Sequence, residues 1–144
     1  MKRTFFTSES VMEGHPDKLC NQIADGILDA ILKEDPFVRV ACDVSASTGL
    51  ITVFGQITTV STVDIPAIVR SIIQAVGYTD SDFGIDGKAC SVLIGLDRQS
   101  PDIAAGVGSS LEKRLGSDDE ADQLGAGDQG LMFGYATNET DVFM

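Results

Sequence analysis

Residues 38–60 read VRVACDVSASTGLITVFGQITTV, two runs rich in β-branched residues that are separated by a short turn. Gly49 lies in the turn, where glycine adopts positive φ at little cost. The pattern therefore predicts two strands, over 38–46 and 50–60, paired as a hairpin. In the first run apolar side chains alternate with other residues, which is typical of a half-buried strand: Val38, Val40, Cys42 and Val44.

Helical periodicity flanks this hairpin on both sides. Residues 16–32 and residues 64–76 carry apolar side chains at helical spacing, and Gly77 suits the end of the second helix. Residues 90–96 alternate as a third strand. The order helix, strand, strand, helix, strand predicts an α+β fold, a two-layer sandwich with helices on one face of a largely antiparallel or mixed sheet.

The composition narrows the class of protein. A formal net charge of −12 argues against a sequence-independent nucleic-acid binder and against docking to an anionic membrane. The three cysteines are widely spaced and have no metal-binding pattern, so we expect free thiols in a reducing compartment. The sequence shows neither a signal peptide nor an apolar run of membrane-spanning length. These features predict a soluble cytoplasmic protein.

Residues 13–18, EGHPDK, combine the single histidine of the chain with a carboxylate and a lysine at the start of the first predicted helix. Pro16 suits the first helical position, and the amide groups that follow favour an anion. His15 can donate a hydrogen bond, Lys18 adds positive charge, and Asp17 can hold a hard divalent cation. The segment predicts a site for a phosphate chain with its metal. The alternative is a capped surface helix with a chance histidine.

A second motif, GAGDQGLMFGYA, occupies residues 125–136. Together with FTSESV at 6–11 and EGHPDK at 13–18, it resembles the amino-terminal part of the S-adenosylmethionine synthetases (methionine adenosyltransferases). The resemblance covers nearly all of the chain, which has only a little over a third of the usual length of that family. Four shorter blocks match in the same order, at residues 39–42, 57–59, 63–65 and 99–103.

The resemblance implies how the chain is organised. Residues 1–98 would form the first structural unit, a repeat unit of the three-domain adenosyltransferase fold. Residues 99–124, rich in glycine and serine, would form a mobile loop that gates the active site, and residues 125–144 would begin a truncated second unit. It also implies a homodimer or a dimer of dimers with active sites between subunits.

The resemblance implies a reaction in which methionine sulfur displaces the triphosphate of ATP, giving S-adenosylmethionine, phosphate and diphosphate. His15 would then be a catalytic contact to the triphosphate, with Lys18 beside it in the ATP site. Asp17 would be a catalytic ligand of Mg²⁺. Asp128, within the second motif, would be a catalytic residue that also contacts ATP.

Two residues depart from the family pattern, one at the predicted methionine site and one at the predicted K⁺ site. Gln99 matches a methionine contact at the root of the gating loop. The family usually has glutamate where this chain has Gln56, a position that would also contact methionine. It usually has glutamate again where this chain has Asp43, which would hold K⁺. Gln56 keeps an acceptor oxygen but loses the negative charge, so weaker methionine binding or an altered amino-acid preference is expected.

Two other functions remain open on the sequence. The chain could be a non-catalytic adenosyltransferase-like module that assembles with another subunit, which the short length, Asp43 and Gln56 favour. It could also be a stand-alone nucleotide-binding protein, although that reading leaves the full set of ordered blocks unexplained. His15, Asp17, Gln99 and Asp128 favour the enzyme.

Overall fold

A computed structural model describes residues 9–102 and 108–123, together with residues 5, 7, 104, 132, 134 and 136–141. The chain divides into two compact units, Met1–Gln99 and Ser100–Met144, which are described separately below. The roles predicted for residues 99–124 and 125–144 remain predictions.

The first unit is built around the predicted hairpin. Strands β1 (Arg39–Ser47) and β2 (Leu50–Thr58) pair antiparallel, with Ser47 opposite Leu50 at the turn. Strand β3 (Ser91–Asp97) pairs with the other edge of β2 in parallel, with Leu50 opposite Ser91. The sheet is therefore mixed, in the order β1-β2-β3. The parallel pair arises because a helical crossover returns the chain to the turn end of the sheet.

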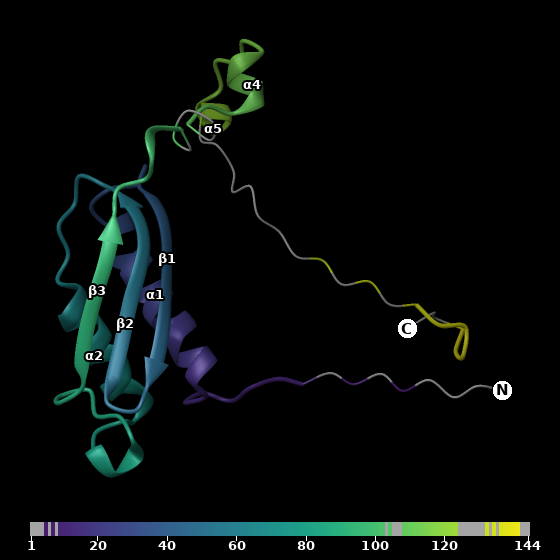
Figure 1. The fold of residues 1–144 in the computed structure, drawn as a ribbon. Coiled ribbons are helices and arrows are strands. Elements are labelled where there is room, and N and C mark those ends of the chain that lie inside the picture. Colours follow the sequence, from purple (N-terminus) through teal and green to yellow (C-terminus); the bar gives the residue numbers. More distant parts are fainter. Residues whose placement is uncertain are drawn as a thin grey trace. The chain divides into compact units, whose positions relative to one another are not determined.

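Two helices cover one face of this sheet (Figure 1). Helix α1 spans Pro16–Leu32 and helix α2 spans Ile65–Val76, as the periodicity predicts. The side chain of Asp64 accepts a hydrogen bond from the Ala67 amide and caps the start of α2. Gly77 ends α2 with a φ of 109°, which is the left-handed cap that the sequence indicates. The predicted α+β class is confirmed.

The core lies between the helices and the sheet. Each fully buried isoleucine contributes about 1.5–3 kcal/mol through removal from water, so the apolar faces of the helices and strands account for the layering. The helices also pack closely, because a methyl group added at Gly26 would lie 2.5 Å from the Ile72 Cδ1 atom. The buried core residues of the described part are Leu19, Ile23, Ile27, Ile31, Ile51, Val53, Val69, Ile73, Ile85 and Cys90.

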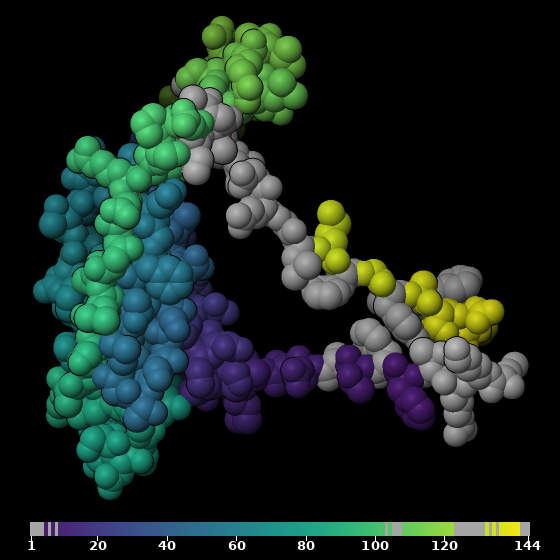
Figure 2. Space-filling view, viewed as in Figure 1, coloured from purple at the N-terminus to yellow at the C-terminus, as the bar shows by residue number. Residues whose placement is uncertain are grey.

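On the opposite face of the sheet, the described residues of the first unit form no helix, and Figure 2 shows this face as a surface of strand residues. Ile51 and Val53 are fully buried toward the helices, so the alternate residues of β2 point to this bare face. Phe54 is 43% exposed there and Leu93 of β3 is 56% exposed. A sheet face with exposed large apolar side chains suits contact with another protein surface.

The connection from α2 to β3 contains a short 3-10 helix, η1 (Ser81–Phe83). The third strand begins one residue later than predicted, so Cys90 precedes β3 instead of lying within it. Cys20 lies in α1 and Cys42 in β1, and all three cysteines are free thiols, as expected. No helix in the described part of the chain is long and apolar enough to cross a membrane.

In the second unit the described residues between 102 and 115 do not form one continuous helix. Residues 102 and 104 are helical, residues 108 and 109 form a bend, and helix α4 spans only Leu111–Arg114. The Ser110 side chain explains the interruption, because it accepts from the Lys113 amide as a new N-cap. It also donates to the carbonyl of Asp122, which lies in the short helix α5 (Glu120–Gln123).

Candidate functional site

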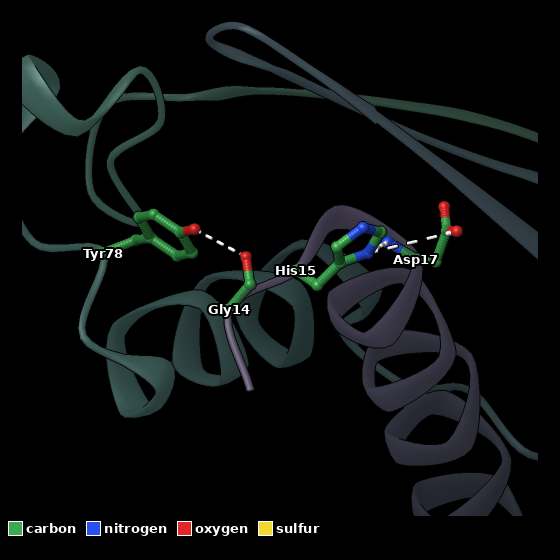
Figure 3. Close-up of polar contacts among 4 residues, drawn as sticks. All are labelled: Gly14, His15, Asp17 and Tyr78. Atoms are coloured by element: carbon green, nitrogen blue, oxygen red, sulfur yellow. Dashed lines mark hydrogen bonds and ion pairs between the residues drawn. The ribbon is translucent and has the colours of Figure 1, made fainter. Parts of the chain in front are cut away.

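His15 is the N-cap residue of α1 (Figure 3). Its backbone is extended, with φ −61° and ψ 138°, and its carbonyl accepts the first helical hydrogen bond from the Leu19 amide at 2.9 Å. Its Nδ1 atom accepts a hydrogen bond from the Asp17 amide at 3.1 Å. The capping role, one of the two alternatives for this histidine, is therefore present, and one of the amides expected to face an anion is used by the imidazole instead.

This cap has a chemical consequence for the other ring nitrogen. A neutral imidazole that accepts through Nδ1 carries its proton on Nε2. The Nε2–H group is then the donor that His15 offers to a ligand, and the side chain is 43% exposed. The cap and the predicted contact to a phosphate oxygen thus use different atoms and are compatible.

Asp17 and Lys18 occupy the first turn of α1. The Asp17 side chain is 87% exposed, so its carboxylate is accessible to a cation in solution, whereas Lys18 is half-buried. A carboxylate in the first turn also interacts favourably with the helix dipole. One accessible carboxylate suits Mg²⁺ that arrives with substrate phosphates, since Mg²⁺ commonly takes one or two carboxylates and completes its shell with water and phosphate oxygens.

Two hollows adjoin the start of α1. The first has a volume of about 330 Å³ and lies between Pro16, the hairpin turn and the segment that contains Tyr78 and Phe83. The second has a volume of about 280 Å³ and is lined by Asp17, Cys20 and the end of β1. Both place the start of α1 at the turn end of the sheet, where β1 ends and β2 begins.

Cys20, beside Asp17, does not offer a reactive thiolate. Partial burial raises the pKa of its thiol, and the nearby Asp17 carboxylate raises it further, although a backbone hydrogen bond at Ala46 opposes this. Burial likewise raises the pKa of Cys42, with a smaller contribution from Asp43. Because the thiolate is the nucleophilic form, neither thiol is suited to nucleophilic catalysis at neutral pH.

The two residues predicted to bind the substrate methionine, Gln56 and Gln99, lie at the other end of the sheet. Gln56 pairs with Ala41 of β1 and with Asp97 of β3, close to where β2 and β3 end. Gln99 lies two residues after the end of β3, and Figure 1 shows the chain leaving the sheet at that end of β3, away from the start of α1. The structure therefore does not bring Gln56 or Gln99 to His15 within one copy.

The register gives the scale of this separation. Ala46, which lines both hollows, is opposite Ile51, and Ile51 precedes Gln56 by five residues on β2. Five residues of strand span about 17 Å at roughly 3.3 Å per residue. Gln56 also points to the bare face, whereas α1 packs against the opposite face. The predicted triphosphate half-site at His15 and the predicted methionine half-site at Gln56 are thus separated along the strands. They also lie toward opposite sides of the sheet.

Asp43 and Gln56 share the bare face, a point that the sequence left open. Asp43 is opposite Phe54, and Gln56 follows Phe54 by two residues. The two side chains are diagonal neighbours, for which about 7–8 Å is typical. Asp43 contributes a single exposed carboxylate, and no group of three His, Cys, Asp or Glu side chains suited to a metal occurs in the described residues. Its assignment to K⁺ remains a prediction.

Asp128 and the remainder of the GAGDQG segment lie outside the described residues, so their predicted roles remain predictions. Two residues of structural importance escape sequence reasoning. Tyr78 donates a hydrogen bond to the Gly14 carbonyl at 2.6 Å, across 64 positions of sequence. Gly55 has a φ of +131°, and a Cβ atom there would lie 2.1 Å from the Ala41 carbonyl oxygen. An isolated glycine within a strand pattern is the signal that could have indicated the second.

Comparison with known proteins decides the family. A family profile described as the N-terminal domain of S-adenosylmethionine synthetase matches residues 3–101. A second profile, described as the central domain of the same enzyme, matches residues 123–144. The chain belongs to the S-adenosylmethionine synthetase family.

Two curated relatives carry the name S-adenosylmethionine synthase. The protein from Clostridium tetani (strain Massachusetts / E88) is 58% identical over 142 residues, which are 99% of this chain and 36% of the relative. The protein from Finegoldia magna (strain ATCC 29328 / DSM 20472 / WAL 2508) is 56% identical over 141 residues, 98% of this chain and 36% of the relative. The chain thus spans about 36% of the length of these synthases.

Proposed function

We propose that this chain is the amino-terminal part of a methionine adenosyltransferase that forms S-adenosylmethionine, phosphate and diphosphate from ATP and methionine. The observation that carries the proposal is the placement of His15 and Asp17 at the start of α1 in a chain of this family. A thioether sulfur needs no deprotonation, so the protein has to align two substrates and stabilise the charge that develops on the leaving triphosphate.

The residues at the start of α1 suit the phosphate side of this reaction. The Nε2–H group of His15 donates to a triphosphate oxygen near the bond that breaks, while the Asp17 amide holds the ring through Nδ1. Asp17 would hold Mg²⁺ in this site, and the ion would supply positive charge to offset the charge that develops on the triphosphate. Lys18 adds positive charge to the same site, and Asp128 completes the ATP site.

The residues at the opposite end of the sheet suit the amino acid. Gln56 and Gln99 bind methionine, and Asp43 lies on the same bare face as Gln56. Asp43 and Gln56 alone do not enclose a K⁺ ion, so no step of the reaction is assigned to potassium.

The separation of the two half-sites favours catalysis by two copies. If two sheets pack through their bare faces around a twofold axis that runs across the strands, the turn end of one copy meets the opposite end of the other. The sheet end beside His15 and Asp17 of one copy then lies next to the sheet end that carries Gln56 and Gln99 in its partner. The exposed Phe54 and Leu93 supply apolar surface for this contact. We therefore propose a homodimer, or a dimer of such dimers, with active sites between subunits.

The alternative is a non-catalytic module that assembles with another subunit, and the loss of a carboxylate at Gln56 is the observation that favours it. A chimera tests the two. Residues 1–144 replace the matching segment of the Clostridium tetani synthase, and S-adenosylmethionine is measured at saturating ATP and methionine. The proposed function predicts turnover, whereas an inactive but folded and dimeric chimera would favour the module.

Two further measurements sharpen this test. In the chimera, His15→Ala should lower turnover by about 10²–10³-fold with a much smaller effect on ATP affinity, because the donor acts mainly in the transition state. Purified residues 1–144 alone should not form S-adenosylmethionine, since a triphosphate needs several cations and the chain has ten Lys and Arg in total. Steady product formation by the chain alone would contradict that part of the proposal.

A further inference from the structure

Tyr78 connects two parts of the first unit that are distant in sequence. It follows Gly77 at the end of α2, where its amide donates to the Ile73 carbonyl at 3.1 Å and fixes the backbone. Its hydroxyl donates to the Gly14 carbonyl at 2.6 Å (Figure 3). The ring packs against the core, so the hydroxyl is held in place by buried contacts.

The bond from Tyr78 acts on the peptide group that joins Gly14 to His15. The amide of that peptide group, which belongs to His15, donates to the Met12 carbonyl at 3.1 Å. Its carbonyl, which belongs to Gly14, accepts from Tyr78. Both polar ends of one peptide plane are thus anchored. This anchoring matters because Gly14 lies before the first residue of α1 and has a φ of +89°, so the helix does not set its backbone conformation.

The orientation of the His15 ring depends on this peptide plane. His15 lies outside the helical backbone, and its ring is oriented by the hydrogen bond that Nδ1 accepts from the Asp17 amide. That bond requires the His15 backbone to stay extended beside the first turn. We propose that Tyr78 is a positioning residue for His15: its hydroxyl fixes the Gly14–His15 peptide and so sets the direction in which Nε2–H points.

The simpler explanation is that Tyr78 only joins the end of α2 to the start of α1. Tyr78→Phe separates the two, because it keeps the ring in the core and removes only the hydroxyl. Thr59→Val is the matched control. The Thr59 hydroxyl also donates at 2.6 Å, to the Asp35 carboxylate near the other end of α1.

The inference rests on the proposed role of His15 at the triphosphate, and the first test uses the chimera with the Clostridium tetani synthase. Tyr78→Phe should lower turnover at least about fivefold, and by no more than the about 10²–10³-fold expected for His15→Ala. ATP and methionine KM should change less than about twofold. In the His15→Ala background, Tyr78→Phe should have no further effect on turnover, because it acts through a group that is gone. Thr59→Val should leave turnover unchanged in both backgrounds.

The second test does not depend on activity. Amide hydrogen exchange of the intact 144-residue chain reports the bond from Asp17 to His15 Nδ1. Loss of the Tyr78 hydroxyl should speed exchange of the Asp17 amide by about 2–13-fold, the effect of one hydrogen bond on local opening. Thr59→Val should leave that amide unchanged relative to the rest of α1.

The outcomes are distinguishable. Equal effects of Tyr78→Phe in the presence and absence of His15, or unchanged exchange at Asp17, would overturn the positioning role and leave Tyr78 as a structural contact, while the proposed function stands. An inactive chimera with faster Asp17 exchange in Tyr78→Phe would refute the proposed function, while the structural control of His15 by Tyr78 stands.

Discussion

Active sites shared between two copies lead to a complementation prediction. Two variants of the chimera are made, His15→Ala at the turn end of the sheet and Gln99→Ala at the opposite end. In a homodimer of either variant, every site carries one substitution. In a mixed dimer, one site carries both substitutions and the other carries none. Mixing should therefore restore activity if each site takes His15 from one copy and Gln99 from the other.

The structure gives the distance between the two groups within one copy, and the symmetry of a dimer gives the activity expected on mixing. Gln99 follows Val92 by seven residues, and Val92 pairs with Ile51 at the level of the hollows beside α1. The part of β3 from Val92 to Asp97 spans about 17 Å and Gln99 lies two residues beyond it, whereas reacting atoms must approach to roughly 3–3.5 Å. One copy is therefore not expected to supply both groups to one site. Random pairing gives about half mixed dimers, so about one quarter of all sites are intact.

The assay is S-adenosylmethionine formation per subunit after co-expression of the two variants with different affinity tags. Selection for both tags leaves only mixed dimers, in which about half of the sites are intact. The control pairs His15→Ala with Asp17→Ala, which lie at the same end of the sheet, so every site of the mixed dimer keeps one substitution and activity should stay low. If the His15 and Gln99 variants together are no more active than either alone, while the unsubstituted chimera is active, the shared-site reasoning is refuted.

Three further predictions concern stability and selectivity. Gly55→Ala should lower the free energy of unfolding by more than about 3 kcal/mol, because backbone strain adds to a clash of Cβ with the Ala41 carbonyl. Gly49→Ala, at positive φ but with open space around it, should lower it by about 1–2 kcal/mol. Equal urea midpoints for the two variants would contradict this. Hydrogen bonds from the Thr59 hydroxyl, and to a lesser extent from the Val60 amide, lower the pKa of Asp35 below its ordinary value of 3.8. These bonds therefore stabilise the folded protein above pH 3.8, and the stabilisation is lost as the pH falls through the lower pKa of the folded state. Thr59→Val should reduce this acid sensitivity in urea unfolding between about pH 2 and 5, and an unchanged pH profile would exclude the Thr59 contribution. Gln56→Glu in the chimera should lower methionine KM about 5–30-fold with little change for ATP; an equal gain for an analogue that lacks the amino group would argue against a contact to the ammonium group.

The helices and strands were largely predictable because their signals are local. The periodicity over 16–32 coincides with α1, and Asp64 and Gly77 flank α2 as its caps. Caps and amphipathic faces act within one or two turns of chain, so the sequence carries them without knowledge of the fold. The contact between Ser110 and α5 was not predictable in this way, because the Ser110 hydroxyl donates to the Asp122 carbonyl 12 positions away.

The candidate site divides in the same way. The sequence alone identified the residue types at the start of α1, because proline, histidine and aspartate there have local roles in capping and charge. Only the tertiary structure placed β3 parallel to β2 and put Asp43 and Gln56 on the bare face. A strand register depends on which faces are buried, and its consequences extend over the whole sheet.

The contact between Tyr78 and Gly14 lies furthest from what the sequence determines. It joins residues 64 positions apart, and neither residue carries a local signal for the other. The same holds for the distance between His15 and Gln99, which are both recognisable in sequence yet lie at opposite ends of one sheet. Local patterns determine which groups are present and how each element starts and ends. The packing of α1 and α2 against the sheet decides which of those groups meet, because a hydrogen bond forms only between atoms that the buried core brings within about 3 Å.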